Sequence, residues 1–164
     1  MLQVRRLTGK DAAAFQALRL KGLREHPDAF GSSFEEEVDR SLDQIAEALD
    51  ARFVAGCERD GVLIGIGGIR RGDSVKTRHR AVIWGLYVDP EARGLGAATL
   101  LMSTLIDHAR GRVEDVTLTV AANNGAAVRL YRRFGFIEYG LDPRALKLGT
   151  DYVDERLMRL VLEG

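Results

Sequence analysis

The stretch Val88-Asp89-Pro90-Glu91-Ala92-Arg93-Gly94-Leu95-Gly96-Ala97-Ala98 gives the strongest indication of the fold. The residues before it, 81–88, are almost wholly apolar and predict a strand that is buried on both faces at the centre of a sheet. The residues from 95 to 110 carry apolar side chains at helical spacing. The quoted stretch is therefore interpreted as a glycine-containing turn that leads from a central strand into a helix.

Such a turn is suited to binding a phosphate group. Its free backbone N–H groups and the positive end of the helix dipole attract a diphosphate, and glycines let the phosphates approach the main chain. Arg93 adds a positive charge beside them. A tight turn without any ligand is the alternative interpretation, because a glycine pair before a helix is a weak signal by itself.

The residues around the glycines do not fit two common nucleotide-binding motifs. No Lys-Ser or Lys-Thr pair follows the glycines, as the loop that binds ATP with Mg²⁺ requires. The dinucleotide fingerprint lacks its third small residue, and Ala121-Ala122-Asn123 stands where an acidic residue would bind the ribose. The sequence therefore disfavours ATP, NAD and FAD as ligands of this turn.

The segments after the turn continue the alternation of strand and helix. Residues 113–120 alternate apolar and polar side chains and predict a strand, which completes a βαβ unit with residues 81–88 and 95–110. Residues 124–134 predict a further helix. Two more strands are expected at residues 136–139 and 152–162.

The segments before the turn predict a strand at residues 2–7, a helix at 11–25 capped by Asp11, and a helix at 41–51. Residues 29–37 match neither pattern. Residues 52–57 and 62–69 flank Asp60-Gly61, a strong signal for a tight hairpin between antiparallel strands. The length of 164 residues and the absence of linkers predict a single domain over residues 1–164, of mixed α/β class.

Composition limits the classes of partner. The 24 Lys and Arg residues balance the 24 Asp and Glu residues, so no overall positive field draws the chain to nucleic acid or to an anionic membrane. The single cysteine, Cys57, cannot form an intramolecular disulfide, and zinc-ligand spacing is missing, so we expect no metal. Without a signal-peptide pattern or a membrane-spanning apolar run, we expect a cytoplasmic protein.

Two segments together resemble the GNAT superfamily of acyl-CoA N-acyltransferases. Residues 93–98 fit the Arg-x-x-Gly-x-Ala form of its acyl-CoA-binding motif, after the usual apolar strand and Val-x-Pro. Asn124-Gly125-Ala126-Ala127-Val128-Arg129-Leu130-Tyr131 resembles the family's Asn-x-x-Ala-x-x-Leu-Tyr segment, and Gly135-Phe136 resembles its ending. The segments occur in the family's order, and the resemblance is closest over residues 81–136, with uncharacterised bacterial members similar elsewhere.

The resemblance implies a central, mostly antiparallel sheet of six to seven strands with about four helices. It also implies an N-acetyltransferase that moves an acetyl group from acetyl-CoA to a primary amine by direct attack on the thioester. Gly85 would form a bulge in the central strand, and an N–H group of this strand would bind the thioester oxygen. The expected acetyl-CoA-binding residues are Leu86, Tyr87, Val88, Arg93, Gly94, Leu95, Gly96, Ala97, Ala98, Asn124, Ala127 and Tyr131.

Two of these residues have structural interpretations as well. Tyr131 shares a helix face with Ala127, Leu130 and Phe134, so the pattern alone makes it a core aromatic. The resemblance makes it the general acid that protonates the departing thiolate, a role that a phenol can fill. Asn124 is a helix N-cap by pattern, and the resemblance adds a hydrogen bond to the pantetheine arm.

The sequence does not identify a general base for the amine. Many relatives place a carboxylate on the central strand, but residues 81–88 contain no acid. The remaining candidates are Glu35, Glu36, Glu37, His26 and His79. Each of them is equally consistent with a solvated surface.

Several functional questions stay open at this stage. An acyl-CoA-binding regulatory module without turnover, or a domain that binds another phosphate ligand, is compatible with the same turn. If the protein is an enzyme, the expected acceptor is a small-molecule or a peptide amine. We further expect a homodimer, in which residues 152–162 pair or pack across a two-fold axis.

Overall fold

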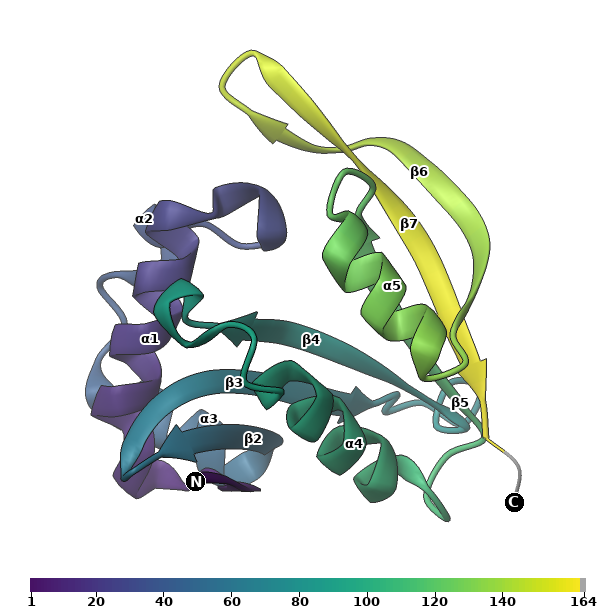
Figure 1. Ribbon diagram of the computed structural model, residues 1–164. Helices are drawn as coiled ribbons and strands as arrows, with labels where there is room; N and C mark the ends of the chain where they lie inside the picture. Colours follow the sequence, from purple (N-terminus) through teal and green to yellow (C-terminus); the bar gives the residue numbers. More distant parts are fainter. Residues whose placement is uncertain (163–164) are drawn as a thin grey trace.

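Residues 1–162, which the computed structural model describes, form one seven-stranded sheet with helices packed on both faces (Figure 1). The strands are β1 (Leu2–Arg6), β2 (Phe53–Arg59), β3 (Val62–Arg71), β4 (Arg80–Val88), β5 (Asp115–Ala121), β6 (Ile137–Leu148) and β7 (Asp151–Val161). The helices are α1 (Ala12–Glu25), α2 (Phe34–Glu37), α3 (Leu42–Ala51), α4 (Ala97–Ala109) and α5 (Gly125–Arg133). None of these helices combines the length and apolarity that crossing a membrane requires.

The strand order is β1-β2-β3-β4-β5-β7-β6, and the only parallel neighbours among these strands are β4 and β5. Helix α4 connects these two strands, as expected for a βαβ unit. The predicted mixed α/β class and the mostly antiparallel sheet are therefore confirmed.

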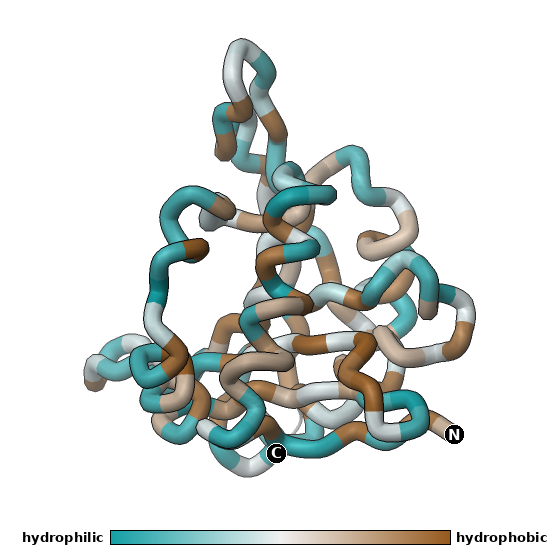
Figure 2. Tube along the Cα trace, turned by 90° about the vertical axis from the view of Figure 1, so that its left-hand side faces the viewer, coloured by the Kyte–Doolittle hydropathy of each residue, from teal (hydrophilic) through white to brown (hydrophobic). Residues whose placement is uncertain are grey.

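The sheet separates two apolar clusters. Val54 and Ala55 are successive residues of β2 and belong to different clusters, because side chains alternate between the two faces of a strand. Helices α1 and α3 cover one face through residues such as Leu18 and Leu49, and α4 covers the other through Leu105. Apolar segments are concentrated where the helices pack on the sheet (Figure 2).

The predicted hairpin between β2 and β3 is confirmed. Arg59 pairs with Val62, so Asp60 and Gly61 form a two-residue connection. Their φ angles are 50° and 83°, and two successive positive φ angles are typical of the turn that matches the twist of the flanking strands.

The prediction that β4 is buried on both faces is wrong. β4 is central in the sheet, but it pairs with β5 only from Arg80 to Val82, and the two strands then separate. As a result Val82 is 39% exposed, and Trp84 and Leu86 are half-buried. The separation leaves space within the sheet that helices do not fill (Figure 1).

Helix α4 begins at Ala97, two residues later than expected. Gly94 and Gly96 have φ angles of 83° and 86°, which lie outside the right-handed helical region. The glycines therefore belong to the turn, and Gly96 takes the N-cap position.

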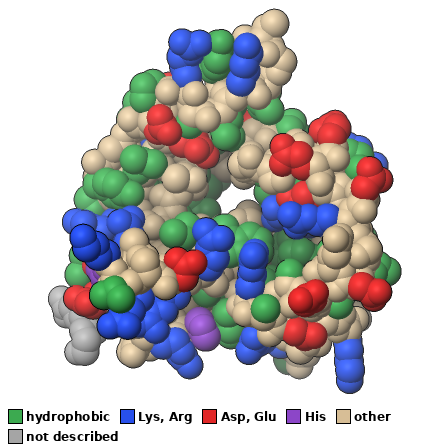
Figure 3. Space-filling view, turned by 180° about the vertical axis from the view of Figure 1, so that it is seen from behind, with side chains coloured by type: hydrophobic (Ala, Val, Ile, Leu, Met, Phe, Trp, Pro, Cys, Tyr) green, Lys and Arg blue, Asp and Glu red, His purple; other side chains and the backbone are tan. Residues whose placement is uncertain are grey.

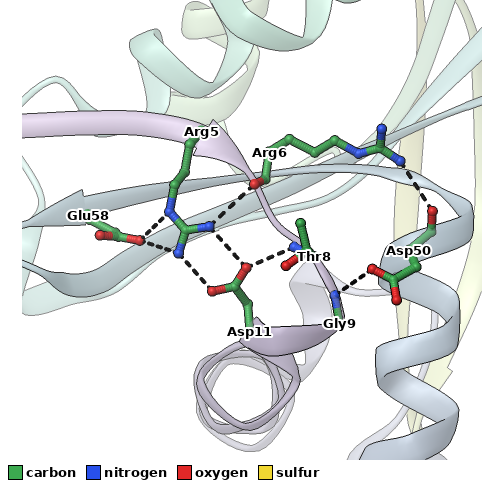
Figure 4. Close-up of polar contacts among 7 residues, drawn as sticks. All are labelled: Arg5, Arg6, Thr8, Gly9, Asp11, Asp50 and Glu58. Atoms are coloured by element: carbon green, nitrogen blue, oxygen red, sulfur yellow. Dashed lines mark hydrogen bonds and ion pairs between the residues drawn. The ribbon is translucent and has the colours of Figure 1, made fainter.

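Asp11 precedes α1 but does not cap it with its side chain (Figure 4). Its carboxylate accepts a hydrogen bond from the Thr8 N–H at 2.8 Å and contacts the Arg5 guanidinium at 2.7 Å. Arg5 also donates to Glu58 on β2 at 2.8 Å. The two ion pairs of Arg5 therefore link β1, β2 and the start of α1. The hydrogen bond from Arg5, despite the opposing effect of burial, holds the pKa of Asp11 below its ordinary value.

The segment that matched no pattern, residues 29–37, ends in the short helix α2. Ser33 caps this helix by accepting a hydrogen bond from the Glu36 N–H at 3.2 Å. The four residues of α2 bring the buried Glu37 against α1.

The C-terminal strands differ from their prediction in length and position. β6 continues through Pro143 to Leu148, far beyond the expected residues 136–139, and forms with β7 a long hairpin that projects from the body (Figure 2). β7 pairs with β5 on one side and with β6 on the other. Residues 155–159 are therefore paired on both sides and offer no edge to a second copy, and the sheet ends at β1 and β6. Packing of residues 152–162 across a two-fold axis stays a prediction.

Candidate active site

A cavity of about 770 Å³ lies where β4 and β5 separate. Its walls come from α1, from residues 29–32, from β4 and the turn that follows it, and from β5, α5 and β7. Seen from behind, the molecule has an opening that passes between the side with α1 and α2 and the side with α5 and the β6–β7 hairpin (Figure 3). A ligand can therefore enter the cavity from more than one face.

Gly85 forms the bulge that the resemblance implies. The pairing of β3 with β4 changes register here, since Ile66 pairs with Tyr87 whereas Gly68 pairs with Trp84. Gly85 has a φ angle of 65°, which only glycine adopts without strain. The bulge interrupts hydrogen bonding at the point where β4 borders the cavity.

The bulge also reverses the alternation of side chains along β4. Ile83 belongs to the α4 side before the bulge, and Leu86 and Val88 belong to that side after it. Leu86 and Val88 line the cavity, whereas the Tyr87 side chain packs into the cluster on the α1 side. Any contact of Tyr87 with a ligand is therefore limited to its main chain.

The turn of residues 93–98 lies at one end of the cavity. Arg93, Gly94, Gly96, Ala97 and Ala98 line it, and the unpredicted Thr99 lines it too. The first N–H groups of α4 have no partner within their own helix, so they are available to a ligand. Leu95 is 44% exposed and does not line the cavity.

Helix α5 brings Asn124, Ala127 and Tyr131 to the same cavity. Asn124 caps the helix, since its side-chain oxygen accepts a hydrogen bond from the Ala127 N–H at 3.2 Å. Tyr131 is 7% exposed, and burial raises the pKa of its hydroxyl to about 12. Tyr131 thus combines both interpretations of the sequence, because it packs in the apolar core and also borders the cavity.

The five candidate bases do not line this cavity. Glu35, Glu36 and His79 are exposed, and His26 packs near Tyr87. Glu37 is buried, where desolvation favours its neutral form, but hydrogen bonds from Arg19 outweigh this effect and keep its pKa below the ordinary value. Glu37 therefore serves as an ion-pair partner.

Glu155 on β7 is the acid that sequence reasoning missed. It is half-buried, and it is the only Asp or Glu among residues 1–162 that lines the cavity. It stands opposite Ala121 of β5 and opposite Asp142 of β6. Burial, together with the like charge of Asp142, raises the pKa of Glu155, and Thr119 only partly opposes this change. The β-rich composition of residues 152–162 predicts a strand but not which strands flank it, so no local pattern indicates this role.

The arrangement provides four chemical features. The turn at the start of α4 has N–H groups that suit a phosphate, and the bulge interrupts β4 in the cavity wall. Tyr131 and Glu155, whose pKa values are both raised, also line the cavity. No group of three or more His, Cys, Asp or Glu side chains within residues 1–162 could hold a metal ion.

Two acetyltransferases of known name are similar to this chain in sequence. A mycothiol acetyltransferase from Brachybacterium faecium is 31% identical over 134 residues, which are 81% of this chain and 40% of that enzyme. The N-alpha-acetyltransferase RimI from Mycobacterium tuberculosis is 39% identical over 98 residues, which are 58% of this chain and 60% of RimI. The chain thus spans less than two thirds of the length of either relative.

The same fold is found in yncA from Salmonella typhimurium, whose structure was solved with its cofactor acetyl-CoA. The TM-score is 0.87 at 22% identity, with 100% of this chain and 95% of that chain covered. A family model described as "Acetyltransferase (GNAT) family" matches residues 20–136, which include both the turn and the Tyr131 helix. Because this family model matches more than half of the chain, the protein belongs to the GNAT acetyltransferase family.

Proposed function

We propose that the protein is an acetyl-CoA-dependent N-acetyltransferase that acts on a primary amine. The observation that carries this proposal is the cavity where β4 leaves β5, with free helix N–H groups at one end and Tyr131 in its wall. Membership of the GNAT family supports it, as does the acetyl-CoA bound to yncA.

In this proposal the diphosphate of acetyl-CoA binds to the turn of residues 93–98. Gly94 and Gly96 bring the main chain close to the phosphates, and Arg93 supplies a positive charge. The pantetheine arm then runs along β4 beside the main chain of residues 86–88 and reaches the Asn124 amide. An N–H group beside the Gly85 bulge donates to the thioester oxygen, where negative charge develops.

The reaction has one bond-forming and one bond-breaking step. The neutral amine attacks the thioester carbon, a C–N bond forms, and the nitrogen loses a proton. The C–S bond then breaks, and the thiolate takes a proton from the Tyr131 hydroxyl. Burial makes Tyr131 a weak acid, but burial of the bound thioester beside the same apolar wall would also raise the pKa of the departing thiol, so the proton transfer stays feasible.

Glu155 is the proposed acceptor of the amine's proton, directly or through water. Glu155→Gln is expected to lower kcat/KM by about 10²-fold at neutral pH, at the low end of general-base effects, because water can replace it in part. Because protonated Glu155 cannot accept a proton, the wild-type rate should fall as pH drops through its raised pKa. The measurement is the pH dependence of thiol release.

Asp142→Asn is the matched control for Glu155. It removes the like charge opposite Glu155, so the acid limb of the pH profile should move to lower pH while the plateau rate stays near that of the wild type. An acid limb of unaltered position and steepness in Glu155→Gln would count against this base.

Two measurements test the proposed function. Calorimetry with acetyl-CoA, CoA and ATP should show binding of the first two and not of ATP. A thiol-release assay over small amines and N-terminal peptides should then show turnover. Acetyl-CoA binding without turnover of any amine would favour the regulatory-module alternative, and ATP binding without acetyl-CoA binding would favour a different phosphate ligand.

Partners and location follow from less direct observations. The balanced charge supports an acceptor other than nucleic acid, and the buried, unpaired Cys57 supports a cytoplasmic site of action. Residues 1–164 are proposed to fold as one domain.

A homodimer is proposed to form through the outer edge of β6. Ile137, Tyr139 and Leu141 on this strand are at least half exposed, so pairing with a second copy would bury apolar surface. Light scattering is expected to give about twice 18.1 kDa, and Leu141→Asp should shift the protein toward the monomer. A single 18.1 kDa species at micromolar concentration would contradict the dimer.

A further inference from the structure

One arginine that lines the cavity has a buried guanidinium nitrogen without a hydrogen-bond partner among residues 1–162. Arg19 on α1 donates from Nε to Glu37 Oε1 at 2.6 Å and from Nη2 to Glu37 Oε2 at 2.9 Å. Its side chain is 12% exposed, and Nη1 is buried without a hydrogen-bond partner among residues 1–162. Leaving such a donor unpaired is unfavourable, so the position is one that a ligand oxygen would complete.

The guanidinium group is held in a fixed orientation. Besides its two bonds to Glu37, it lies over the rings of Phe30 and Trp84, at 5.5 Å and 5.6 Å from their centroids. Glu37 is itself 2% exposed, so the pair has little freedom to rearrange. The orientation of the Nη1 donors is therefore fixed before a ligand binds.

Nη1 lies close to the place where the proposed function puts the thioester. A Cβ atom built on Gly85 would lie 2.9 Å from Arg19 Nη1, with no other atom within 4 Å. Nη1 thus lies against the bulge of β4, beside the main chain that receives the thioester in the proposed function. A group bound to Nη1 has to be only a few bonds from the attacking nitrogen.

Arg19 is shared between the cavity that contains the turn of residues 93–98 and a second space. This second space is a cavity of about 560 Å³, formed by α1, α2, α3 and the start of β2, which contains none of the turn residues. The two cavities share Arg19, Ser32 and Trp84. Because the second cavity contains no turn residue, an acceptor that reaches Arg19 from this cavity does not compete with the diphosphate of CoA.

The charge of the site distinguishes two kinds of oxygen. Glu37 neutralises Arg19, so the pair offers N–H donors without a net positive charge. A carboxylate at Nη1 would be repelled by Glu37, whereas an amide carbonyl accepts the same hydrogen bonds without repulsion. The site therefore suits a neutral carbonyl oxygen.

We infer that Arg19 binds the carbonyl oxygen next to the acceptor's amine, so that the acceptor is an α-aminoacyl amide, as at a peptide N-terminus. This inference rests on the proposed function for the location of the thioester, and it names the substrate class of that site. Arg19 acts as a specificity-determining residue and takes no part in the proton transfers.

The test measures binding, so it does not depend on turnover. The wild-type protein is saturated with CoA, and calorimetry gives the Kd of L-alanine N-methylamide, of free L-alanine, and of sec-butylamine, which lacks the carbonyl. The amide is expected to bind about 10- to 100-fold more tightly than sec-butylamine, as for a hydrogen bond from a charged donor. Free L-alanine is expected to bind less tightly than the amide.

Arg19→Lys is the matched variant, because lysine keeps a positive charge beside Glu37 but lacks the planar fork and its Nη1 group. The ratio of the two Kd values should fall toward one in this variant, and comparing ratios between proteins cancels the different basicities of the two amines. If Arg19→Lys does not fold, the double variant Arg19→Met, Glu37→Leu removes the pair without leaving a buried charge.

The possible results distinguish failure of the Arg19 inference from failure of the proposed acetyl transfer. A ratio near one in the wild type, a ratio that survives Arg19→Lys, or tighter binding of free L-alanine would overturn the inference. Selective amide binding that Arg19→Lys abolishes supports it even when no amine releases thiol. The lack of thiol release with every amine would refute only the proposed acetyl transfer.

Discussion

Replacing Tyr131 with phenylalanine is expected to slow acetyl transfer by about 10²- to 10⁴-fold, the usual effect of losing a general acid. The hydroxyl is the only group removed, and the ring keeps its contacts with the core, including the tilted packing on Phe136 at 6.0 Å between centroids. Stability and acetyl-CoA affinity should therefore change little. The measurement is thiol release in a single turnover, since slow product release would hide part of the loss in steady state.

The matched control for Tyr131 is Tyr152→Phe, which removes a hydroxyl from a half-exposed ring outside the cavity. This variant should react at the wild-type rate. The pKa of about 12 for Tyr131 adds a second check, because the phenol stays protonated at pH 10 and its ionisation should not lower the rate there. A Tyr131→Phe protein with the wild-type single-turnover rate would leave Tyr131 as a core aromatic only.

Replacing Gly96 with valine is expected to abolish acetyl-CoA binding. Gly96 has a φ angle of 86°, a conformation that costs an L-residue about 1–2 kcal/mol and a β-branched residue more. A Cβ atom there meets no protein atom within 4 Å, so the added side chain would fill the space in which the phosphates approach the main chain. Calorimetry with acetyl-CoA measures the loss.

The control for Gly96 has to carry the same backbone strain away from the site. Gly111 has a φ angle of 78°, and a Cβ atom there also meets nothing within 4 Å, but it does not line the cavity. Gly111→Val should therefore lose a similar amount of stability in denaturant unfolding and keep its affinity for acetyl-CoA. Equal affinity in a folded Gly96→Val protein would contradict binding of the diphosphate at this turn.

Several elements were predictable because their conformations depend on neighbours in the sequence. Asp60-Gly61 forms a tight hairpin since both residues adopt positive φ angles at small cost. Asn124 caps α5 through a hydrogen bond to a residue only three positions away. The Gly94 and Gly96 turn follows from the same local freedom of the main chain, whereas the bulge at Gly85 was expected from the resemblance to the GNAT family.

Other features were predicted wrongly because they depend on pairing between distant segments. The apolar character of residues 81–88 indicates burial, but β5 leaves β4 after Val82 and exposes one face to the cavity. Asp11 would cap α1 if only its own helix were near, yet Arg5 and the Thr8 N–H bind its carboxylate instead. Pairing of residues 152–162 with a second copy would need a free edge, but β5 and β6 occupy both sides of residues 155–159.

By itself, then, the sequence determined the mixed α/β class, the glycine turn, and the helix that carries Tyr131, since all three depend on residue types at short spacings. The GNAT fold was expected from the resemblance of two segments to that family. Only the tertiary structure decided that Glu155 borders the cavity and that Arg19 directs Nη1 at the Gly85 bulge. The physical reason is that a raised pKa or an unpaired donor arises from desolvation and from the charges nearby. Those surroundings come from strands and helices far apart in the chain, and they exist only once the sheet has formed.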